Sequence, residues 1–406
     1  GSVDFWFLEQ EARLRYLPNT KRYLYKAMDW SPRCLGILGA RGTGKTTMML
    51  QYLSEHQHGS EKALYVAVDH PKFQNLSLYE FGREFSSYGG QILLLDEVHK
   101  YDNWAGHIKT LYDTCPDLQI IFSGSSILQL QDQDADLSRR AVMHTLHGLS
   151  FREFLFFELG VSFPVLDVED ILRDHVTQTR HILRQIKPLE HFRQYLQYGY
   201  YPFFLEGTDV YGLKLGQVIN HVLEVDLPLI KQIDLRQVSK LKKLITFLAV
   251  NVPSKVNIQK LSSHTEISRP KIYEYLESLE QAKLLNLIKP SQTGYKILSK
   301  PDKIYLENPN LMYALSDAIN IGTLRETFFV NQMGNTIFPL PSQNIRSMCT
   351  ARQGDFVVNE TYTFEIGGRN KGGKQIQGLE NAFIAADEVE SGFGNRIPLW
   401  LFGFLS

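Results

Sequence analysis

The sequence predicts an α/β protein whose first part is a parallel, doubly wound sheet, and three observations predict it. An apolar run at 34–38 leads into a glycine-rich stretch at 39–46, and a helical pattern of apolar residues follows. Further short apolar runs end in Asp96-Glu97 and in Ser123-Gly124-Ser125-Ser126. Such runs, alternating with helical stretches, are typical of a parallel sheet that binds its ligand at the carboxyl ends of the strands.

The glycine-rich stretch fits the phosphate-binding pattern G-x-x-x-x-G-K-[ST] at every fixed position. Its backbone N–H groups would point at phosphate oxygens, at the positive end of a helix dipole. We expect Lys45 to contact the β- and γ-phosphates and the Thr46 hydroxyl to join the shell of a Mg²⁺ ion. A chance glycine-rich turn is the alternative, but it would not need the strand and helix around it. The residues expected to bind ATP or ADP are Gly39, Ala40, Arg41, Gly42, Thr43, Gly44, Lys45, Thr46 and Thr47.

Two carboxylates follow the apolar run at 91–95, as in a Walker B motif. We expect Asp96 to hold Mg²⁺ through water, and Glu97 to orient and deprotonate the attacking water. Acidic pairs after apolar runs are common by chance, but this one follows the phosphate-binding loop by roughly 50 residues. The run at 63–68 likewise ends in a carboxylate, Asp69.

Further catalytic candidates follow the next apolar run. Ser123 or Ser125 would lie beside Asp96 and sense the γ-phosphate, although a serine there also caps the next helix. About a dozen residues later, Arg139 and Arg140 are candidates to neutralise charge on the γ-phosphate, within the chain or from a neighbouring subunit. Of the two we favour Arg140; the alternative is that both are solvated helix residues.

Composition limits the class of protein and its partners. At 406 residues the chain is long enough for two to four domains. Its formal net charge is −1, so any contact with nucleic acid must be local. Three widely separated cysteines favour a reducing compartment and make no metal-ligand pair. No apolar run approaches the roughly 18 residues that a membrane span needs, so we expect a cytoplasmic protein without membrane contact.

These motifs, taken with several later ones, resemble the prokaryotic AAA+-type P-loop ATPases that carry a C-terminal domain of unknown function. The likeness spans nearly the whole chain and implies ATP binding and a restriction-endonuclease-like C-terminal fold. It also implies that a helical subdomain covers the nucleotide as a lid. The later stretches that carry the likeness are 148–154, 198–202, 303–311 and 364–368.

Periodicity and motif order divide the chain into four expected domains. A P-loop ATPase domain at 3–149 precedes a helical lid subdomain at 150–235, where apolar residues recur at three- and four-residue spacing. A winged-helix-like domain is expected at 236–300 and a PD-(D/E)xK nuclease-like domain at 301–406. The aromatic cluster at 198–204 is a candidate binding surface, but we favour core packing for it.

The winged-helix prediction comes from a helix, turn, helix and strand pattern at 257–288. Across the expected winged-helix-like domain at 236–300, basic residues exceed acidic ones by about seven, which suits local contact with DNA or RNA. However, Glu274 and Glu277 on the second helix would repel phosphates, so docking of a protein partner is equally open. The basic residues are Lys240, Lys242, Lys243, Lys255, Lys260, Arg269, Lys271, Lys283, Lys289, Lys296 and Lys300.

Three carboxylates in the last hundred residues match the frame of PD-(D/E)xK nucleases, in which they hold a catalytic metal. Glu326 lies in a predicted helix, Asp355 opens a strand and Glu365 closes the next. The lysine of the E-x-K pattern is missing, because position 367 is glycine. Lys371 and Lys374 are the candidates to substitute for it, but a glycine-rich loop is a poor mount for a catalytic group. We therefore predict a nuclease fold without nuclease activity.

Three functions are compatible with these residues. The leading one is an ATPase that is slow unless a partner or second subunit supplies an arginine, and whose nucleotide state is transmitted to the later domains. The second is a nucleotide-switched DNA-binding or scaffold protein with negligible turnover. The third is an ATP-dependent nuclease that acts through Glu326, Asp355 and Glu365. The physiological partner and the oligomeric state do not follow from the sequence.

Overall fold

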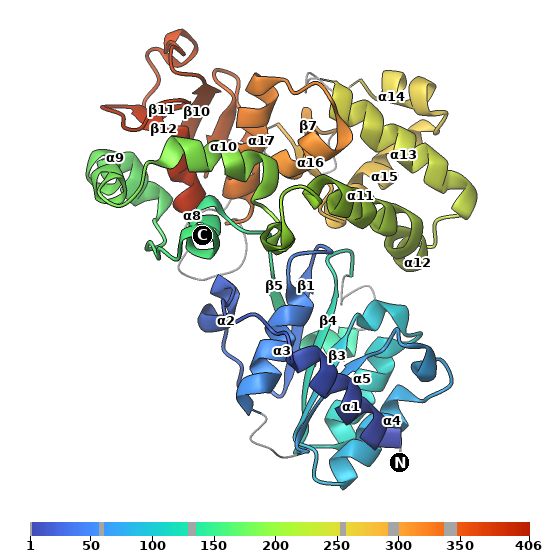
Figure 1. Ribbon diagram of the computed structural model, residues 1–406. Coiled ribbons are helices and arrows are strands. Elements are labelled where there is room, and N and C mark those ends of the chain that lie inside the picture. The colour runs from blue at the N-terminus through green and yellow to red at the C-terminus, as the bar shows by residue number, and fades with distance from the viewer. Residues whose placement is uncertain (1, 57–60, 129–134, 252–256, 291–299, 337–346) are drawn as a thin grey trace. The chain divides into compact units, whose positions relative to one another are not determined.

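The computed structural model describes residues 2–56, 61–128, 135–251, 257–290, 300–336 and 347–406. The chain divides into two compact units, Gly1–His147 and Gly148–Ser406 (Figure 1). Within the described residues, none of the helices is both long and apolar enough to cross a membrane.

The first unit contains a parallel five-stranded sheet in the order β2-β3-β4-β1-β5. Four of the strands correspond to the predicted apolar runs. The fifth, β5, was not predicted, because it is a short edge strand whose side chains are exposed or half-buried and form no apolar run. The strands are β1 (Cys34–Gly39), β2 (Ala63–Ala67), β3 (Ile92–Asp96), β4 (Gln119–Ser125) and β5 (Val142–Thr145).

Helices accompany the strands of this sheet. The apolar faces of α3 and β1 share one core with buried residues of β2, β3 and β4. The helices are α1 (Ser2–Leu14), α2 (Tyr23–Ala27), α3 (Lys45–His56), α4 (Leu78–Ser87), α5 (Trp104–Thr114) and α7 (Ala135–Arg140), with short 3-10 turns η1 (Pro71–Phe73) and η2 (Val98–Lys100).

Strand order determines which strand ends become neighbours. Because β4 pairs with β1 on one side and with β3 on the other, the loop after β1 and the carboxylates after β3 flank the end of β4. The loop itself turns through Gly42 and Gly44, whose φ angles of 88° and 100° favour glycine. All three motifs therefore meet at one edge of the sheet.

The second unit begins with a predominantly helical part. Its elements are α8 (Phe151–Leu159), α9 (Val168–Leu183), α10 (Pro188–Tyr198), η3 (Pro202–Glu206), α11 (Tyr211–His221), a π-helical turn η4 (Val222–Asp226) and α12 (Leu227–Lys231). Tyr200 and Tyr201 of the aromatic cluster are buried, in keeping with the favoured core role. The Tyr200 hydroxyl donates to Glu307 at 2.8 Å, and Asn308 donates to the Tyr201 hydroxyl at 2.9 Å. A buried polar network thus joins two of the later stretches.

The region of the predicted winged helix contains α13 (Leu235–Val250), α14 (Ile258–Thr265) and α15 (Arg269–Gln281). Strand β6 (Leu285–Ile288) pairs antiparallel with β7 (Lys303–Leu306). This pair extends beyond position 300, where the sequence suggested a boundary. The order of helix, turn, helix and strand at 257–288 agrees with the predicted pattern.

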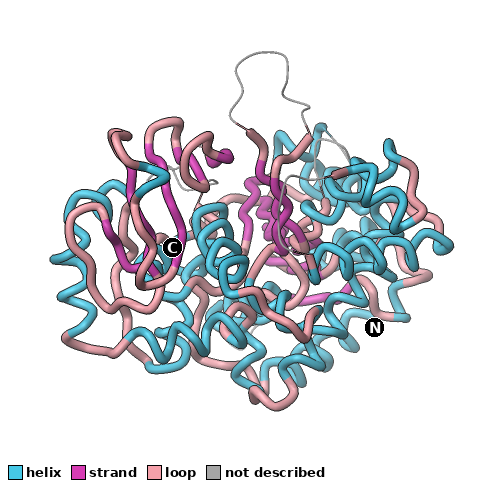
Figure 2. Tube along the Cα trace, turned by 90° about the horizontal axis from the view of Figure 1, so that it is seen from above, coloured by secondary structure: helices cyan, strands magenta, loops and turns pink. Residues whose placement is uncertain are grey.

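The last part of the second unit holds a mixed sheet in the order β12-β11-β10-β9-β8. The β8–β9 and β9–β10 pairs are antiparallel, whereas the β10–β11 and β11–β12 pairs are parallel. Figure 2 draws the strands of the chain in magenta along the Cα trace. Its elements are α16 (Pro309–Leu315), α17 (Ile321–Gly334), β8 (Met348–Thr350), β9 (Phe356–Val358), β10 (Tyr362–Gly367), η6 (Lys374–Ile376), β11 (Ala382–Ala386), β12 (Arg396–Pro398) and η7 (Leu399–Phe404).

Candidate functional site

The phosphate-binding loop is held in shape by its own side chains. Lys45 Nζ donates to the carbonyl oxygens of Gly39 and Ala40, at 2.7 and 2.9 Å. The buried guanidinium of Arg22 donates to the carbonyl oxygens of Thr43 and His147, at 2.5 and 2.6 Å. Arg22 lies outside the motif and was not predicted. A triphosphate would offer Lys45 charged oxygens in place of neutral carbonyls, which makes stronger hydrogen bonds.

Asp96 accepts hydrogen bonds from three hydroxyl groups. The Thr46 hydroxyl donates to Asp96 Oδ2 at 2.6 Å, the Tyr65 hydroxyl donates to the same oxygen, and the Ser123 hydroxyl donates to Oδ1. Burial and the neighbouring Asp96 charge raise the pKa of Tyr65, so it remains a donor. The hydroxyl and carboxylate oxygens of Thr46 and Asp96 are ligands that suit Mg²⁺. The two predicted metal residues therefore fit the ion.

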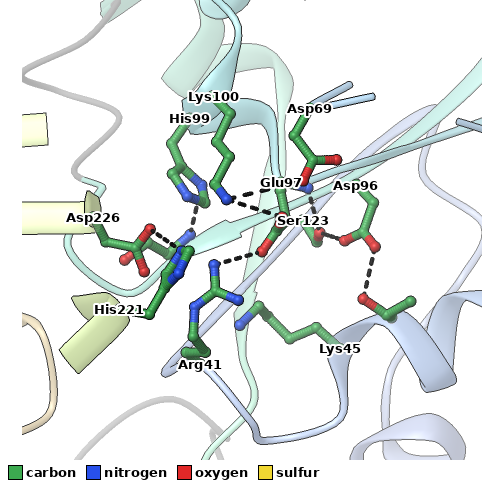
Figure 3. A network of polar contacts seen from close by, with 12 residues as sticks. Arg41, Lys45, Asp69, Asp96, Glu97, His99, Lys100, Ser123, His221 and Asp226 are labelled. Carbon is green, nitrogen blue, oxygen red and sulfur yellow. Dashed lines mark hydrogen bonds and ion pairs between the residues drawn. The ribbon is translucent and has the colours of Figure 1, made fainter. Parts of the chain in front are cut away.

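Glu97 lies at the end of β3 in a left-handed backbone conformation, with φ 55° and ψ 50°. A non-glycine residue there costs of order 1 kcal/mol, and such residues cluster at functional sites. Its N–H donates to Ser123 Oγ at 3.1 Å. Its Oε1 accepts from Arg41 at 2.9 Å, and its Oε2 lies 3.6 Å from Lys100 Nζ (Figure 3).

The charge on Glu97 depends on these neighbours. Burial by itself would raise its pKa, but the cations of Arg41 and Lys100, together with His99, outweigh burial and lower the pKa. Asp69, 3.9 Å from Lys100, behaves in the opposite way, because burial and the charge of Glu97 raise its pKa. A general base must be ionised at the working pH, and Glu97 meets that requirement.

The two serine candidates differ in position. Ser123 is fully buried and connects Asp96 to the backbone of Glu97, as described above. The hydroxyl of Ser125 instead accepts from the N–H of Ile127 at 3.2 Å, which is the turn-forming alternative. The backbone N–H of Ser125 donates to His99 Nδ1 at 3.4 Å. Ser123 is therefore the serine that lies among the Walker B carboxylates.

The two arginine candidates lie in α7 and pair with acidic residues. Arg139, whose side chain is 74% exposed, pairs with Asp136 on the same helix. Arg140 donates to both oxygens of Asp113 on α5, at 2.9 and 3.2 Å. Neither ion pair involves a residue of the phosphate-binding loop or the Walker B pair. A catalytic role for either arginine stays a prediction.

In the second unit, lysines and a tyrosine surround the three predicted carboxylates. Lys303 Nζ lies 3.4 Å from Glu326 Oε1 and 3.9 Å from Asp355 Oδ1. The Tyr305 hydroxyl donates to Glu326 at 2.8 Å. Burial raises the pKa of Glu326 and of Glu365, and the charge of Asp355 raises both further. Lys303 and Tyr305 were not predicted, because they lie in β7, far from the carboxylates in sequence.

The side chain of Lys371 lies where the side chain of a lysine at position 367 would lie, although position 367 is glycine. Its Nζ lies 2.8 Å from Glu365 Oε1. A Cβ built on Gly367 would fall 2.5–2.6 Å from side-chain carbons of Lys371, so the lysine occupies the room that a side chain at 367 would need. The glycine-rich loop therefore does mount an ammonium group on Glu365. In the described parts of the chain, however, no three His, Cys, Asp or Glu side chains are grouped so that they could hold a metal ion.

Several predicted basic residues of the winged-helix region have partners. Lys240 donates to the carbonyl oxygen of Glu266 at 3.1 Å, Lys242 pairs with Glu224, and Lys271 lies 3.2 Å from Glu274. Lys255 and Lys296 lie outside the described residues. Contact with nucleic acid stays a prediction for this region.

A comparison with protein families agrees with the geometry of the first site. Residues 31–155 match the family described as AAA domain. The candidate site lies within the residues that match this AAA domain. This AAA domain contains the phosphate-binding loop, Asp96, Glu97 and Ser123. Residues 189–322 match a domain of unknown function, DUF8612, and this range includes the region of the predicted winged helix at 236–300.

Two relatives come from Methanocaldococcus jannaschii. The uncharacterized protein MJ1637 is 27% identical over 304 residues, which cover 71% of this chain and 62% of the relative. The uncharacterized protein MJ1544 is 21% identical over 331 residues, which cover 79% of this chain and 67% of the relative. The chain thus spans less than two thirds of the length of the first relative.

Two solved structures show a weaker likeness. AMPPCP-bound DnaA from Aquifex aeolicus has a TM-score of 0.26 at 16% identity, covering 70% of this chain and 89% of that chain. A DNA replication initiation factor has a TM-score of 0.27 at 13% identity, covering 64% of this chain and 85% of that chain. TM-scores this low do not establish a shared overall fold.

Proposed function

We propose that the chain is a Mg²⁺-dependent ATPase that converts ATP and water to ADP and phosphate. The observation that carries the proposal is the hydrogen-bonded set at the ends of β1, β3 and β4. In this set Thr46 and Ser123 both donate to Asp96, and Ser123 accepts from the backbone of Glu97. The AAA family match supports the same function.

Each residue has a role that follows from its position. Lys45 would exchange the carbonyls of Gly39 and Ala40 for β- and γ-phosphate oxygens. Thr46 and Asp96 would hold Mg²⁺, which when bound neutralises charge on the triphosphate. Glu97, kept ionised by its cationic neighbours, orients the attacking water and accepts its proton.

The nucleotide state would be transmitted to the second unit, where the winged-helix region binds nucleic acid or a protein partner. Only ATP offers a γ-phosphate that distinguishes two states of the AAA domain. Because Arg139 and Arg140 are paired with Asp136 and Asp113, we propose that turnover is slow until a partner or a second subunit supplies an arginine.

Phosphate release by wild type, Lys45→Ala and Glu97→Gln tests the proposal. We expect turnover in wild type only, and ATP binding in wild type and Glu97→Gln but not in Lys45→Ala. Equal release by all three proteins would contradict the enzyme assignment. Tight ATP retention with no turnover in wild type would favour the nucleotide-switched binding protein instead.

A second candidate function, cleavage of DNA or RNA phosphodiesters in the second unit, is favoured by one observation. Lys371 places an ammonium group 2.8 Å from Glu365, although position 367 is glycine. Our sequence-based prediction of an inactive fold relied on the lack of that lysine. Incubation of a labelled DNA and a labelled RNA with Mg²⁺ or Mn²⁺ tests the point. Cleavage by wild type that is lost in both Asp355→Ala and Lys371→Ala would support the nuclease, and no cleavage would leave the cluster structural.

A further inference from the structure

The arginine in the phosphate-binding loop contacts the general base of the proposed reaction. Arg41 lies between Ala40 and Gly42 in the loop, and its Nη2 donates to Glu97 Oε1 at 2.9 Å. The two side chains are 26% and 24% exposed. In Figure 3 the guanidinium of Arg41 points toward the Glu97 carboxylate. The loop that would wrap the triphosphate therefore also holds the base.

We propose that Arg41 is a latch that the γ-phosphate opens. In the nucleotide-free AAA domain the guanidinium holds the Glu97 carboxylate. When ATP binds, the guanidinium transfers to γ-phosphate oxygens, and Glu97 is released to bind the attacking water. This inference rests on the proposed ATPase function and gives Arg41 two roles, positioning of Glu97 without ATP and contact with the γ-phosphate when ATP is bound.

The γ-phosphate and the Glu97 carboxylate compete for the guanidinium of Arg41, and the γ-phosphate is the stronger partner. A γ-phosphate carries more negative charge than a carboxylate and presents several oxygens, which suit the planar fork of a guanidinium. ADP lacks this group, so it leaves Arg41 on Glu97. The base would then be freed only when the phosphate to be transferred is present.

The rest of Glu97 is anchored, so that only its carboxylate has to move. Its backbone N–H is bound to Ser123 and its φ of 55° is fixed by the turn into η2. Lys100 lies 3.6 Å from the other carboxylate oxygen. After Arg41 leaves, Lys100 remains as a cation beside the freed carboxylate and keeps it near the phosphate site.

Stability alone does not account for the pair. Both side chains are partly exposed, and ion pairs in contact with solvent contribute little to folding. The contact also joins two functional motifs that are 56 residues apart in sequence. The pair therefore connects two motifs of the proposed site.

Binding of ATP and of ADP, each with Mg²⁺, to Arg41→Gln tests the latch. We expect ATP affinity to fall roughly tenfold to a hundredfold, the value of a lost charged hydrogen bond, while ADP affinity stays within about twofold of wild type. Arg41→Lys should restore part of the preference for ATP over ADP. Arg83→Gln, an exposed arginine on α4, is the matched control and should change neither affinity. An unchanged ratio of ATP to ADP affinity in Arg41→Gln would overturn the latch.

A second pair of variants does not depend on the stability of Arg41→Gln. Glu97→Gln removes the anion that competes for Arg41, so ATP should bind more tightly than in wild type while ADP binding is unchanged. In the double variant Arg41→Gln/Glu97→Gln this gain should disappear. A gain that survives in the double variant, or no gain in Glu97→Gln, would contradict the latch. Failure of wild type to bind ATP would instead remove the proposed function itself.

Discussion

The pKa of Glu97 in the AAA domain and the pKa values of Glu326 and Glu365 in the second unit are shifted in opposite directions. In the AAA domain, cations outweigh burial and lower the pKa of Glu97. In the second unit, burial and a neighbouring carboxylate outweigh the lysines and raise the pKa of Glu326 and Glu365. A carboxylate that is already ionised can act as a base, whereas crowded carboxyls need an added cation before all of them ionise. The comparison therefore gives the first site an ionised base, whereas the second site needs a cation before all its carboxyl groups ionise.

The largest effect is expected at the base itself. Glu97→Gln keeps the shape of the side chain but removes the proton acceptor, so ATP turnover should fall by roughly 10²–10⁴-fold. Single-turnover phosphate release with saturating ATP is the measurement. Turnover within a factor of about three of wild type would mean that another group, such as Asp69, takes the proton.

Next in size is the loss of the ammonium group in the second unit. Lys371→Ala leaves the carboxylate of Glu365, which is 2% exposed, without its cation, and should lower the free energy of unfolding by about 1–3 kcal/mol. Urea denaturation measures it. Lys374→Ala, at an exposed position of the same loop, is the control and should cost less than about 0.5 kcal/mol. Equal effects of the two variants would show that the Lys371 contact does not hold the loop.

A smaller effect is expected from the buried hydroxyl beside Asp96. Tyr65→Phe removes one donor to Asp96 and should cost about 0.5–1.5 kcal/mol of stability. Because Thr46 and Ser123 still donate to Asp96, the Mg²⁺ concentration that gives half-maximal turnover should change little. Thermal unfolding and a Mg²⁺ titration check the two parts. A large loss of Mg²⁺ affinity would make Tyr65 part of the metal site.

The smallest effect, and the sharpest test of the contrast, is the pH dependence of two variants. The folded pKa of Glu97 is lowered, so its stabilisation is present above its ordinary pKa and is lost as pH falls. The folded pKa of Glu326 is raised, so its ionisation destabilises the fold as pH rises. As pH rises, the free energy of unfolding of wild type should therefore increase relative to that of Glu97→Gln. Relative to that of Glu326→Gln, it should decrease. Urea denaturation between about pH 4 and 7 measures both differences in stability. If the two differences change with pH in the same direction, the pKa values of Glu97 and Glu326 are not shifted in opposite directions.

Prediction from sequence succeeded where the chemistry is local. The phosphate-binding loop is continuous in the chain with the strand that ends at Gly39 and the helix that begins at Lys45. The positive φ angles at Gly42 and Gly44 could be expected because glycine adopts them readily. The proximity of Asp96 and Ser123 could also be predicted, because the carboxyl ends of parallel strands lie at one edge of the sheet. The predicted order of helix, turn, helix and strand at 257–288 also agrees with the structure.

Other groups could not be predicted because they reach the sites through tertiary packing. Arg22 closes the loop from outside the motif, and Tyr65 and Lys303 reach their carboxylates from other strands. Lys371 reaches Glu365 from the loop after β10, beyond position 367 where the pattern expects the lysine, so a fixed-spacing pattern does not find it. Signals of this kind are weak in one sequence, since a single lysine or tyrosine has many structural uses.

The most direct test is a crystal structure with Mg²⁺ and a non-hydrolysable ATP analogue. The account predicts that backbone amides of 39–46 surround the phosphates and that Lys45 leaves the carbonyls of Gly39 and Ala40 for phosphate oxygens. Thr46 and Asp96 should then lie at the metal. A loop that contains no nucleotide, or a Lys45 that stays on its own carbonyls while nucleotide binds elsewhere, would contradict it.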